Sequence, residues 1–390
     1  MKAVEIRKDI YWVGAIDWSM RSFHGYETSR GSSYNAYLIL DDKVTLIDTV
    51  KEPFKEELLE RISSVIDPAK IDYIISNHVE PDHSGSLPFM MAHCPNAKVI
   101  TSIPNGLKGL KSRYGELPYE GVKAGDTLTI GKRTLQFVPT PMLHWPDSMV
   151  TYCPEEKILF SNDAFGQHLA SSNRFDDQND LGVLYYEAKK YYANILMLYG
   201  RQAQKALKDL KNLDIEMIAT GHGIIWRSHI KEIHDLYEKW STGVLEKRAV
   251  VVFDTMWHST EKMARTITEA FEEKGVPATF YDIKKNALSD IMTDILTSPS
   301  ARRPSTTRCC RRLPRSSATS KASRPKATKP SPSAPTAGAA RASASSKTNS
   351  KPPAAKSSSK NSACSTRRTK KRTKNSAKPS SPSADFPSLI

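Results

Sequence analysis

The 390-residue sequence contains few cysteines and no long apolar segment. Its five cysteines show neither the spacing of a disulfide framework nor that of a zinc knuckle, which favours a reducing, cytoplasmic compartment. The N-terminal segment MKAVEIRKDIYWVGAID carries charges throughout, unlike a secretory signal peptide. No apolar run approaches the roughly 20 residues that cross a bilayer, so a membrane protein is not expected.

Acidic residues are almost missing from the C-terminal part of the chain. Residues 297–390 contain 22 of the 57 Lys and Arg residues but a single acidic residue, Asp385. Because the whole chain carries a net charge of +15, residues 1–296 carry a net charge of −6. The overall positive charge therefore does not describe a folded domain, and no nucleic-acid partner is expected from it.

The same C-terminal segment also has almost no aromatic or β-branched apolar residues. A composition of Ser, Ala, Lys, Pro, Thr and Arg cannot bury a core, so residues 297–390 are expected to form a disordered basic tail. A natural tail would explain this composition. The change in composition at residue 297, however, falls inside the unit that begins near residue 247, and that unit needs more strands to form a complete domain.

The tail can be read as coding sequence displaced by one nucleotide. With suitable codons, RSSATSKAS becomes AFLSYFKGL, SPSAPTAGAARAS becomes IAFGAYGWGGEGV and KTNSKPPA becomes KDELKAAG. All three segments use the same register, and the second and third yield an aromatic-glycine loop and an amphipathic helix. Because local and global signals agree in natural domains, a shifted frame explains the tail better than a natural basic segment does.

Residues 1–245 alternate between short apolar runs and helical segments. IYWVGAID, SSYNAYLIL, KVTLIDT and IDYIISNH predict strands. PFKEELLERISSVI predicts a helix with one apolar face, and residues 186–213 predict a long helical stretch. This order predicts an α/β fold in which two packed sheets are covered by helices on both outer faces.

Residues 247–296 predict a second unit. RAVVVFDT has the composition of a buried strand, STEKMARTITEAFEEKG is an amphipathic helix with a glycine stop, and VPATFYDIKK is a second strand. This order is typical of a βαβ unit with parallel strands.

Seven potential metal ligands follow apolar strands. SNHVEPDHSG holds four of them within six residues, and three later loops hold one each, so all could converge at one sheet edge; they are His78, Glu80, Asp82, His83, His144, Asp163 and His222. Seven ligands are too many for one tetrahedral ion and suit two metals, with Asp163 as the natural bridge. Imidazoles and carboxylates without a thiolate favour iron over zinc, although carboxylate-bridged zinc sites also exist.

These motifs resemble a known family. Residues 1–245 resemble the metallo-β-lactamase superfamily, whose usual H-x-H-x-D-H motif appears here with Glu80 at its second histidine position. This substitution, followed by a flavodoxin-like unit, resembles the flavodiiron proteins. The resemblance implies a metallo-β-lactamase-like αββα sandwich and a truncated flavodoxin-like unit. It also implies a first iron held by His78, Glu80 and His144, a second held by Asp82, His83 and His222, and Asp163 as the bridge.

Three further side chains are placed near this centre by the resemblance. SFHGYETSRGSSYNAYLI is similar to the family's N-terminal segment, which places His24 near the diiron pocket. Tyr191 or Tyr192, in KKYYANIL, resembles a tyrosine that lines it. We expect catalytic roles for His24 and Tyr191, while core packing or hydrogen bonding explains such side chains equally well.

The loop in VVVFDTMWHSTEKMA places hydroxyl groups between a strand and a helix. Backbone N–H groups at a helix start can hold a phosphate dianion together with hydroxyls, although helix capping also explains hydroxyls there. The loop resembles the FMN phosphate site of flavodoxins and comprises Thr255, Met256, Trp257, His258, Ser259 and Thr260. Two further flavin loops are absent as written, and the shifted frame supplies GSPT and AYGWGG as candidates.

The resemblance implies an oxidoreductase that passes electrons through FMN to a non-haem diiron centre and reduces dioxygen, nitric oxide or both. It implies rubredoxin or a reduced deazaflavin coenzyme as electron donor. It also implies a head-to-tail homodimer or a dimer of dimers, in which the flavin of one subunit serves the iron centre of the other. The alternatives are a dinuclear zinc hydrolase, a nucleic-acid-binding protein led by the basic tail, and a non-catalytic remnant.

Overall fold

The computed structural model describes residues 1–298. The predictions of a displaced frame and of two missing flavin loops, and the predicted disordered tail from residue 299 onward, lie outside the described residues. For Thr297 and Ser298, which the predicted tail includes, disorder is wrong: both are buried, and Thr297 Oγ1 donates to Glu246 Oε2 at 3.1 Å. No helix within the described part has the length and apolarity needed to cross a bilayer.

Two β-sheets form the centre of residues 1–245. The first has the strand order β1 (Val4–Arg7), β2 (Ile10–Trp12), β7 (Tyr37–Ile39), β8 (Val44–Ile47), β9 (Ile71–Ser76), β10 (Lys98–Ser102) and β11 (Tyr119–Val122). The second has the order β12 (Thr127–Thr129), β13 (Thr134–Pro139), β14 (Met149–Cys153), β15 (Ile158–Asn162) and β16 (Met217–Thr220). Two short antiparallel pairs accompany them: β3 (Ala15–Asp17) with β6 (Ser32–Tyr34), and β4 (Ser22–Phe23) with β5 (Tyr26–Glu27).

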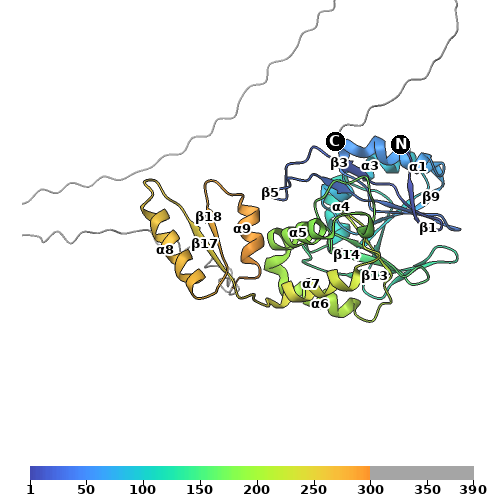
Figure 1. Cartoon of the computed structure of the whole chain (residues 1–390). Helices are drawn as coiled ribbons and strands as arrows, with labels where there is room; N and C mark the ends of the chain where they lie inside the picture. The colour runs from blue at the N-terminus through green and yellow to red at the C-terminus, as the bar shows by residue number, and fades with distance from the viewer. Residues whose placement is uncertain (299–390) are drawn as a thin grey trace, which may run out of the picture. The chain divides into compact units, whose positions relative to one another are not determined.

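Helices cover the outer face of each sheet (Figure 1). Against the first sheet lie α1 (Lys55–Ser63), α3 (Leu87–His93) and α4 (Asn105–Tyr114), and the short α2 (Pro81–Ser84) follows β9. Against the second sheet lie α5 (Leu181–Tyr191), α6 (Gly200–Leu210) and α7 (Ile230–Thr242). The layers are therefore helix, sheet, sheet, helix.

Along the central strands, side chains point alternately toward the covering helices and toward the other sheet, and this alternation produces the layers. On β9, Ile74 packs with the helices of the first sheet, while Ile75 packs between the sheets. On β15, Leu159 packs with the helices of the second sheet, while Phe160 packs between the sheets. Because successive strand residues point to opposite faces, a strand buried on both sides is apolar throughout. The αββα sandwich predicted from the sequence is confirmed.

The long helical stretch predicted over residues 186–213 is interrupted in the structure. After α5, a π-helical segment (Tyr192–Leu196) and a 3-10 turn (Met197–Tyr199) precede α6. A π turn inserts an extra residue into the helical repeat, and such turns are frequent at functional sites. Here it lies directly after Tyr191, the last residue of α5.

The second unit contains β17 (Ala249–Phe253), α8 (Ser259–Glu273), β18 (Ala278–Asp282) and α9 (Leu288–Ile295). Its two strands are parallel, as predicted, with Val251 opposite Phe280. Helix α9 packs against α5, where Asp290 accepts hydrogen bonds from the hydroxyl of Tyr186 (2.9 Å) and forms an ion pair with the ammonium of Lys190 (2.7 Å). The domain boundary near residue 246 stays a prediction.

A buried arginine ties the two sheets together at one end. Arg133 lies between β12 and β13 and is 1% exposed. Its Nε donates to Glu156 Oε1 at 2.7 Å, its Nη2 to the carbonyl of Lys8 at 2.9 Å, and its Nη1 to the carbonyl of Leu40 and to Asp41 Oδ2. These partners lie in turns of both sheets, at the end opposite the end of β9.

We expect Arg133→Leu to lower the free energy of unfolding by about 3–5 kcal/mol, because it leaves the buried carboxylate of Asp41 without its cation. Lys132→Ala is the matched control. Lys132 is exposed and pairs with Asp9 at the surface, so its loss should cost less than about 1 kcal/mol. Urea denaturation followed by circular dichroism measures both values, and equal small losses would contradict the role of Arg133.

Candidate metal centre

One edge of the sandwich gathers the ligand-bearing loops. His78, Glu80, Asp82 and His83 follow β9, His144 precedes β14, Asp163 follows β15 and His222 follows β16. Strands β15 and β16 are parallel and end at the same edge, while β14 is antiparallel to β15 and begins there. Strand topology therefore brings loops that are distant in sequence to one place.

All seven side chains predicted as ligands meet at this edge. His78, Glu80, His144 and Asp163 each offer one ligand atom within 4.8 Å of the others. His83, Asp163 and His222 form a second such group, and His24, Asp82 and His222 a third. Asp163 belongs to two groups, as expected of a carboxylate between two metals.

Several atoms of the cluster are buried without a hydrogen-bond partner. Within residues 1–298 these include both carboxylate oxygens of Asp82, Oδ2 of Asp163, and Nε2 of His144 and His222. Buried polar atoms without partners are costly unless another group, such as a cation, satisfies them. In the described part of the chain the candidate ligand atoms are nitrogen and oxygen only, since the free thiols of Cys94 and Cys153 are buried in apolar clusters. The residues present therefore fit two cations that accept imidazole and carboxylate ligands.

The electrostatic field in the cluster favours positive charge. Burial acts to lower the pKa of His78, but hydrogen bonds with Asp147 and Glu80 outweigh it and raise that pKa to about 10. Burial acts in the same direction on His83, where the carboxylates of Asp82 and Asp163 raise the pKa to about 9. A field that holds protons on buried imidazoles also attracts metal cations.

Outer residues fix the direction of the ligating rings, and sequence reasoning missed them. Asp147 Oδ2 lies 2.8 Å from His78 Nδ1 and also accepts the N–H of Val79, so His78 Nε2 points into the cluster. His222 Nδ1 lies 2.7 Å from the carbonyl oxygen of Ser33. Such partners set the ring orientation of metal-binding histidines. Asp147 stands three residues after His144, and this spacing was a usable signal in the sequence. The carbonyl of Ser33 belongs to the backbone, so no residue type in the sequence indicates its role.

A glycine allows two ligand loops to approach each other. A Cβ at Gly221 would lie 2.8 Å from Cε1 of His83 and 3.0 Å from the backbone carbon of Asn162. Any larger residue would push His222 and His83 apart. The glycine of ATGHG is thus explained by packing between loops.

His24 lies beside the cluster, as the resemblance predicts. It occupies the turn between β4 and β5 with φ 51°, followed by Gly25 with φ 79°, and two left-handed residues suit a tight hairpin turn. Its Nε2 lies 3.6 Å from Glu80 Oε1 and 3.7 Å from Asp82 Oδ2. The hairpin therefore presents His24 to both groups of ligands.

His168, which was not predicted as a site residue, contacts the ring nitrogen of His24 that does not face Glu80 and Asp82. Its Nε2 lies 3.1 Å from His24 Nδ1, and its Nδ1 lies 2.8 Å from Ser32 Oγ. Burial, together with the neighbouring His222 and His24, holds the pKa of His168 well below its usual range. A neutral ring with a partner on each nitrogen connects Ser32 to His24.

The structure separates the two candidate tyrosines. The hydroxyl of Tyr191 donates to Asp163 Oδ1 at 2.9 Å, whereas Tyr192 packs edge-on against Tyr237 and near Trp240 in the core. Burial, with the nearby charge of Asp163, raises the pKa of Tyr191 well above its ordinary value, so its hydroxyl stays protonated.

The predicted phosphate loop lies between β17 and α8. Ser259 and Thr260 begin the 15-residue α8, whose first N–H groups have no partner inside the helix. Thr255 Oγ1 is buried with no hydrogen-bond partner in the described residues, and His258 has a φ of 62°. Met256 and Trp257 are 76% and 83% exposed. The loop thus offers donors to a dianion and apolar side chains beside it.

Comparison with known proteins places the chain among related sequences and structures. Residues 33–223 match the family model described as "ODP family beta lactamase". The chain is 47% identical over 299 residues to a protein named nitric oxide reductase from Moorella thermoacetica, covering 75% of each chain. It is 44% identical over 302 residues to the rubredoxin-oxygen oxidoreductase of Megalodesulfovibrio gigas, covering 76% of this chain and 75% of the relative.

A solved structure gives the same result for the fold. The crystal structure of the flavodiiron protein from Giardia intestinalis superposes with a TM-score of 0.74 at 39% identity. The match covers 76% of this chain and 73% of that protein. The similarity therefore extends over the sandwich and into the second unit.

We expect the purified protein to bind about two metal ions per chain, because the ligand atoms exceed what one tetrahedral ion accepts. Asp163→Asn replaces the carboxylate shared by two groups of ligands with a neutral amide. It should therefore reduce the metal content to about one ion per chain or fewer. Asp214→Asn, which removes an exposed carboxylate that pairs with Lys157 before β16, should keep both ions. Elemental analysis after dialysis measures these values, and full metal content in Asp163→Asn would contradict the shared role.

Proposed function

This chain belongs to the flavodiiron proteins, and from that premise we propose that it reduces dioxygen to water, nitric oxide to nitrous oxide, or both. The proposal includes two irons in the cluster at the sheet edge and FMN as the electron carrier. The observation that supports it most is the convergence of seven nitrogen and oxygen ligands, Glu80 among them, with several of their atoms lacking other partners.

The groups of ligand atoms support a division between two metals. We assign His78, Glu80 and His144 to the first iron and Asp82, His83 and His222 to the second, with Asp163 shared. Reduced iron would supply electrons and open coordination positions for the gas. The remaining groups of the chain hold the ligands, exclude water and supply protons.

One side chain is placed to transfer a proton, and another holds the shared ligand in place. His24 Nε2 faces Glu80 and Asp82, and its Nδ1 contacts His168, which is not one of the assigned metal ligands. His24 would therefore be the proton donor to a substrate bound between the two groups of ligands. The hydroxyl of Tyr191 donates to Asp163 and fixes that carboxylate.

A dinuclear zinc hydrolase is the weaker interpretation. The matched relatives are named as reductases of nitric oxide and dioxygen, and the chain continues into a parallel βαβ unit with a phosphate-type loop. A hydrolase requires neither a flavin nor such a unit. The nucleic-acid alternative depends on residues 297–390, of which the structure describes only Thr297 and Ser298.

FMN binding depends on the part of the chain after residue 298. We propose that the loop from Thr255 to Thr260 holds the FMN phosphate, supported by the unpartnered Thr255 Oγ1 and the start of α8. About a quarter of each matched relative has no counterpart in the similarity. We propose that a displaced reading frame in residues 297–390 accounts for this missing part.

The electron donor and the assembly also belong to this proposal. One matched relative is named for rubredoxin, which supports a rubredoxin-type donor, and a reduced deazaflavin coenzyme is the alternative. We propose a head-to-tail homodimer as the smallest working unit in a reducing cytoplasm, and a dimer of dimers as the larger one. The exposure of Met256 and Trp257 beside the flavin loop supports a second subunit at that surface.

His168 provides a test of the proton route. In a chain whose reading frame after residue 296 is restored, we expect His168→Phe to lower kcat about tenfold with iron content unchanged, because His24 loses the partner of its Nδ1. His168→Gln keeps a polar group at that place and should restore much of kcat. Iron loss in the Phe variant, or equal kcat values for Phe and Gln, would show that His168 only packs the core.

The cofactors can be tested with the chain as written and with a version in which the frame is restored. We expect both to contain about two irons per chain, since the ligands lie before residue 223. Only the restored chain should carry FMN, seen in its visible spectrum, and reduce dioxygen or nitric oxide with reduced rubredoxin. Zinc without iron in both proteins, together with hydrolase activity, would refute the proposed function.

A further inference from the structure

The ligand Asp163 lies between two residues with a left-handed backbone conformation. Asn162, the last residue of β15, has a φ of 50°, and Phe165 has a φ of 64°. Asparagine tolerates this region, whereas a bulky aromatic residue is a rare exception there. A conformation of this kind persists only where the surrounding structure imposes it. Phe165 is therefore held in place by other parts of the chain.

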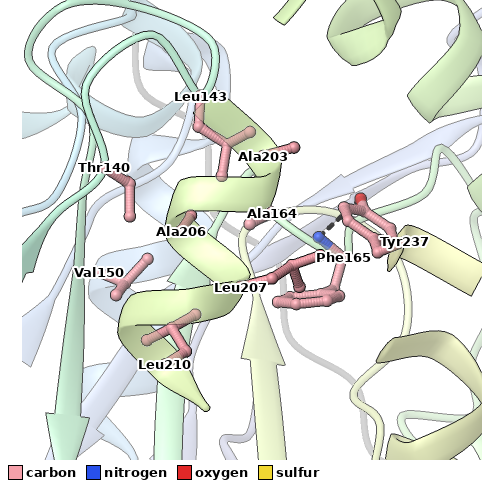
Figure 2. Close-up of a pocket in the computed structure, with 10 residues that line it drawn as sticks. All are labelled: Thr140, Leu143, Val150, Ala164, Phe165, Ala203, Ala206, Leu207, Leu210 and Tyr237. Atoms are coloured by element: carbon pink, nitrogen blue, oxygen red, sulfur yellow. Dashed lines mark hydrogen bonds between the residues drawn. The ribbon is translucent and has the colours of Figure 1, made fainter. Parts of the chain in front are cut away.

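Two buried aromatic side chains hold the backbone of Phe165. Its N–H donates to the hydroxyl of Tyr237 at 2.8 Å, which is the dashed line in Figure 2. Its carbonyl accepts the indole N–H of Trp226 at 2.9 Å. Tyr237, on α7, is 1% exposed, and Trp226 is fully buried. Both backbone polar groups of this residue are therefore bonded to side chains from a distant part of the chain, away from water.

The turn that contains Phe165 also fixes the position of Asp163. The N–H of Gly166 donates to the carbonyl of Asp163 at 3.1 Å, and the hydroxyl of Ser161 donates to the carbonyl of Ala164 at 2.7 Å. The carbonyl of Phe165 and the N–H of Gly166 belong to one planar peptide group. The indole that holds this carbonyl therefore also holds the N–H that is bonded to Asp163.

Asp163 needs a fixed direction because its two carboxylate oxygens face different imidazoles. Oδ1 lies 3.0 Å from His83 Nε2, and Oδ2 lies 3.3 Å from His144 Nε2. A carboxylate that turns away from either ring can bind one metal ion but cannot join two. The hydroxyl of Tyr191 donates to Oδ1 and not to Oδ2. The direction of Oδ2 therefore depends on the backbone that carries Asp163.

We propose that Tyr237 and Trp226 are positioning residues for the shared carboxylate. They hold Phe165 in its left-handed conformation, and the turn around it then directs the two oxygens of Asp163 toward two metal ions. Neither side chain is itself a candidate ligand. Their importance for the reduction of dioxygen or nitric oxide rests on the proposed function, whereas their effect on the binding of two cations does not.

Mn²⁺ provides a test that does not depend on activity. The full-length chain is stripped of metal with a chelator and titrated with Mn²⁺ alone, and the bound ions are counted and examined by electron paramagnetic resonance. Two ions joined by a carboxylate give an exchange-coupled signal, whereas separate ions give the signal of isolated Mn²⁺. The unaltered chain should bind about two ions with the coupled signal, since its ligand atoms exceed what one ion accepts.

Tyr237→Phe removes one hydroxyl and keeps the ring. It leaves the N–H of Phe165 buried without an acceptor, so the turn should relax. We expect the second Mn²⁺ to bind about tenfold more weakly, as when a group behind a metal ligand is lost, and the coupled signal to give way to that of isolated ions. Trp226→Phe removes the bond on the other side of Phe165 and should produce the same two changes, which keeps the test decisive if Tyr237→Phe does not fold.

Tyr152→Phe is the matched control. Tyr152 is 4% exposed and packs in the same apolar cluster as Tyr237. Its hydroxyl donates to the carbonyl of Asp214 at 2.6 Å, before β16 and away from the ligand edge. The loss of this hydroxyl should lower the stability of the fold in a similar way but leave both ions and the coupled signal unchanged. Equal losses of Mn²⁺ in the two tyrosine variants would mean that the hydroxyl of Tyr237 acts only on overall stability.

The proposal and the proposed function fail in different ways. Tyr237→Phe and Trp226→Phe that bind two ions as tightly as the unaltered chain, with the coupled signal, overturn the positioning role. A chain with the restored frame that contains iron and FMN but reduces neither gas, while the Mn²⁺ results are as expected, refutes the proposed function and leaves the positioning role supported.

Discussion

The carboxylate of Asp163 belongs to two of the groups of candidate metal ligands and holds them together. Its Oδ1 lies 3.0 Å from His83 Nε2 and 3.4 Å from His222 Nε2, and its Oδ2 lies 3.3 Å from His144 Nε2. Oδ1 also accepts a hydrogen bond from the hydroxyl of Tyr191. A buried carboxylate is costly unless positive or hydrogen-bonding groups surround it. Burial acts to raise the pKa of Asp163, yet His83 and His144 hold it well below its usual value. The loops that carry these imidazoles therefore converge on the negative charge of Asp163.

The fold tolerates this charged centre because the two edges of the sandwich have different roles. At one edge the ends of β9, β15 and β16 present polar loops, while at the other Arg133 joins turns of both sheets through buried hydrogen bonds. Between the edges the central strands β9 and β15 bury apolar side chains on both faces. A rigid middle holds loops in place whose own polar groups would repel one another.

Particular residues show how far sequence reasoning reached. The H-x-E-x-D-H run and the three single-ligand loops were recognised because each follows an apolar strand, and the structure brings all seven side chains together. His24 was placed near them by resemblance, and the structure puts it there. The helical stretch after residue 186 was predicted without its π turn, because periodicity over so many residues does not register one inserted residue. His168 was missed, since a lone histidine in AFGQHLA carries no pattern.

The sequence by itself determined the residue types at the cluster, the two-layered pattern of strands and helices, and the change of composition at residue 297. These are local properties, carried by neighbouring residues and their periodicity. Only the tertiary structure decided that Tyr191 and not Tyr192 contacts Asp163, that Asp147 and the carbonyl of Ser33 orient the ligating rings, and that Tyr237 and Trp226 hold the backbone of Phe165 beside Asp163. Those relations join residues far apart in the chain, and their distances are set by packing between layers, which no local pattern encodes.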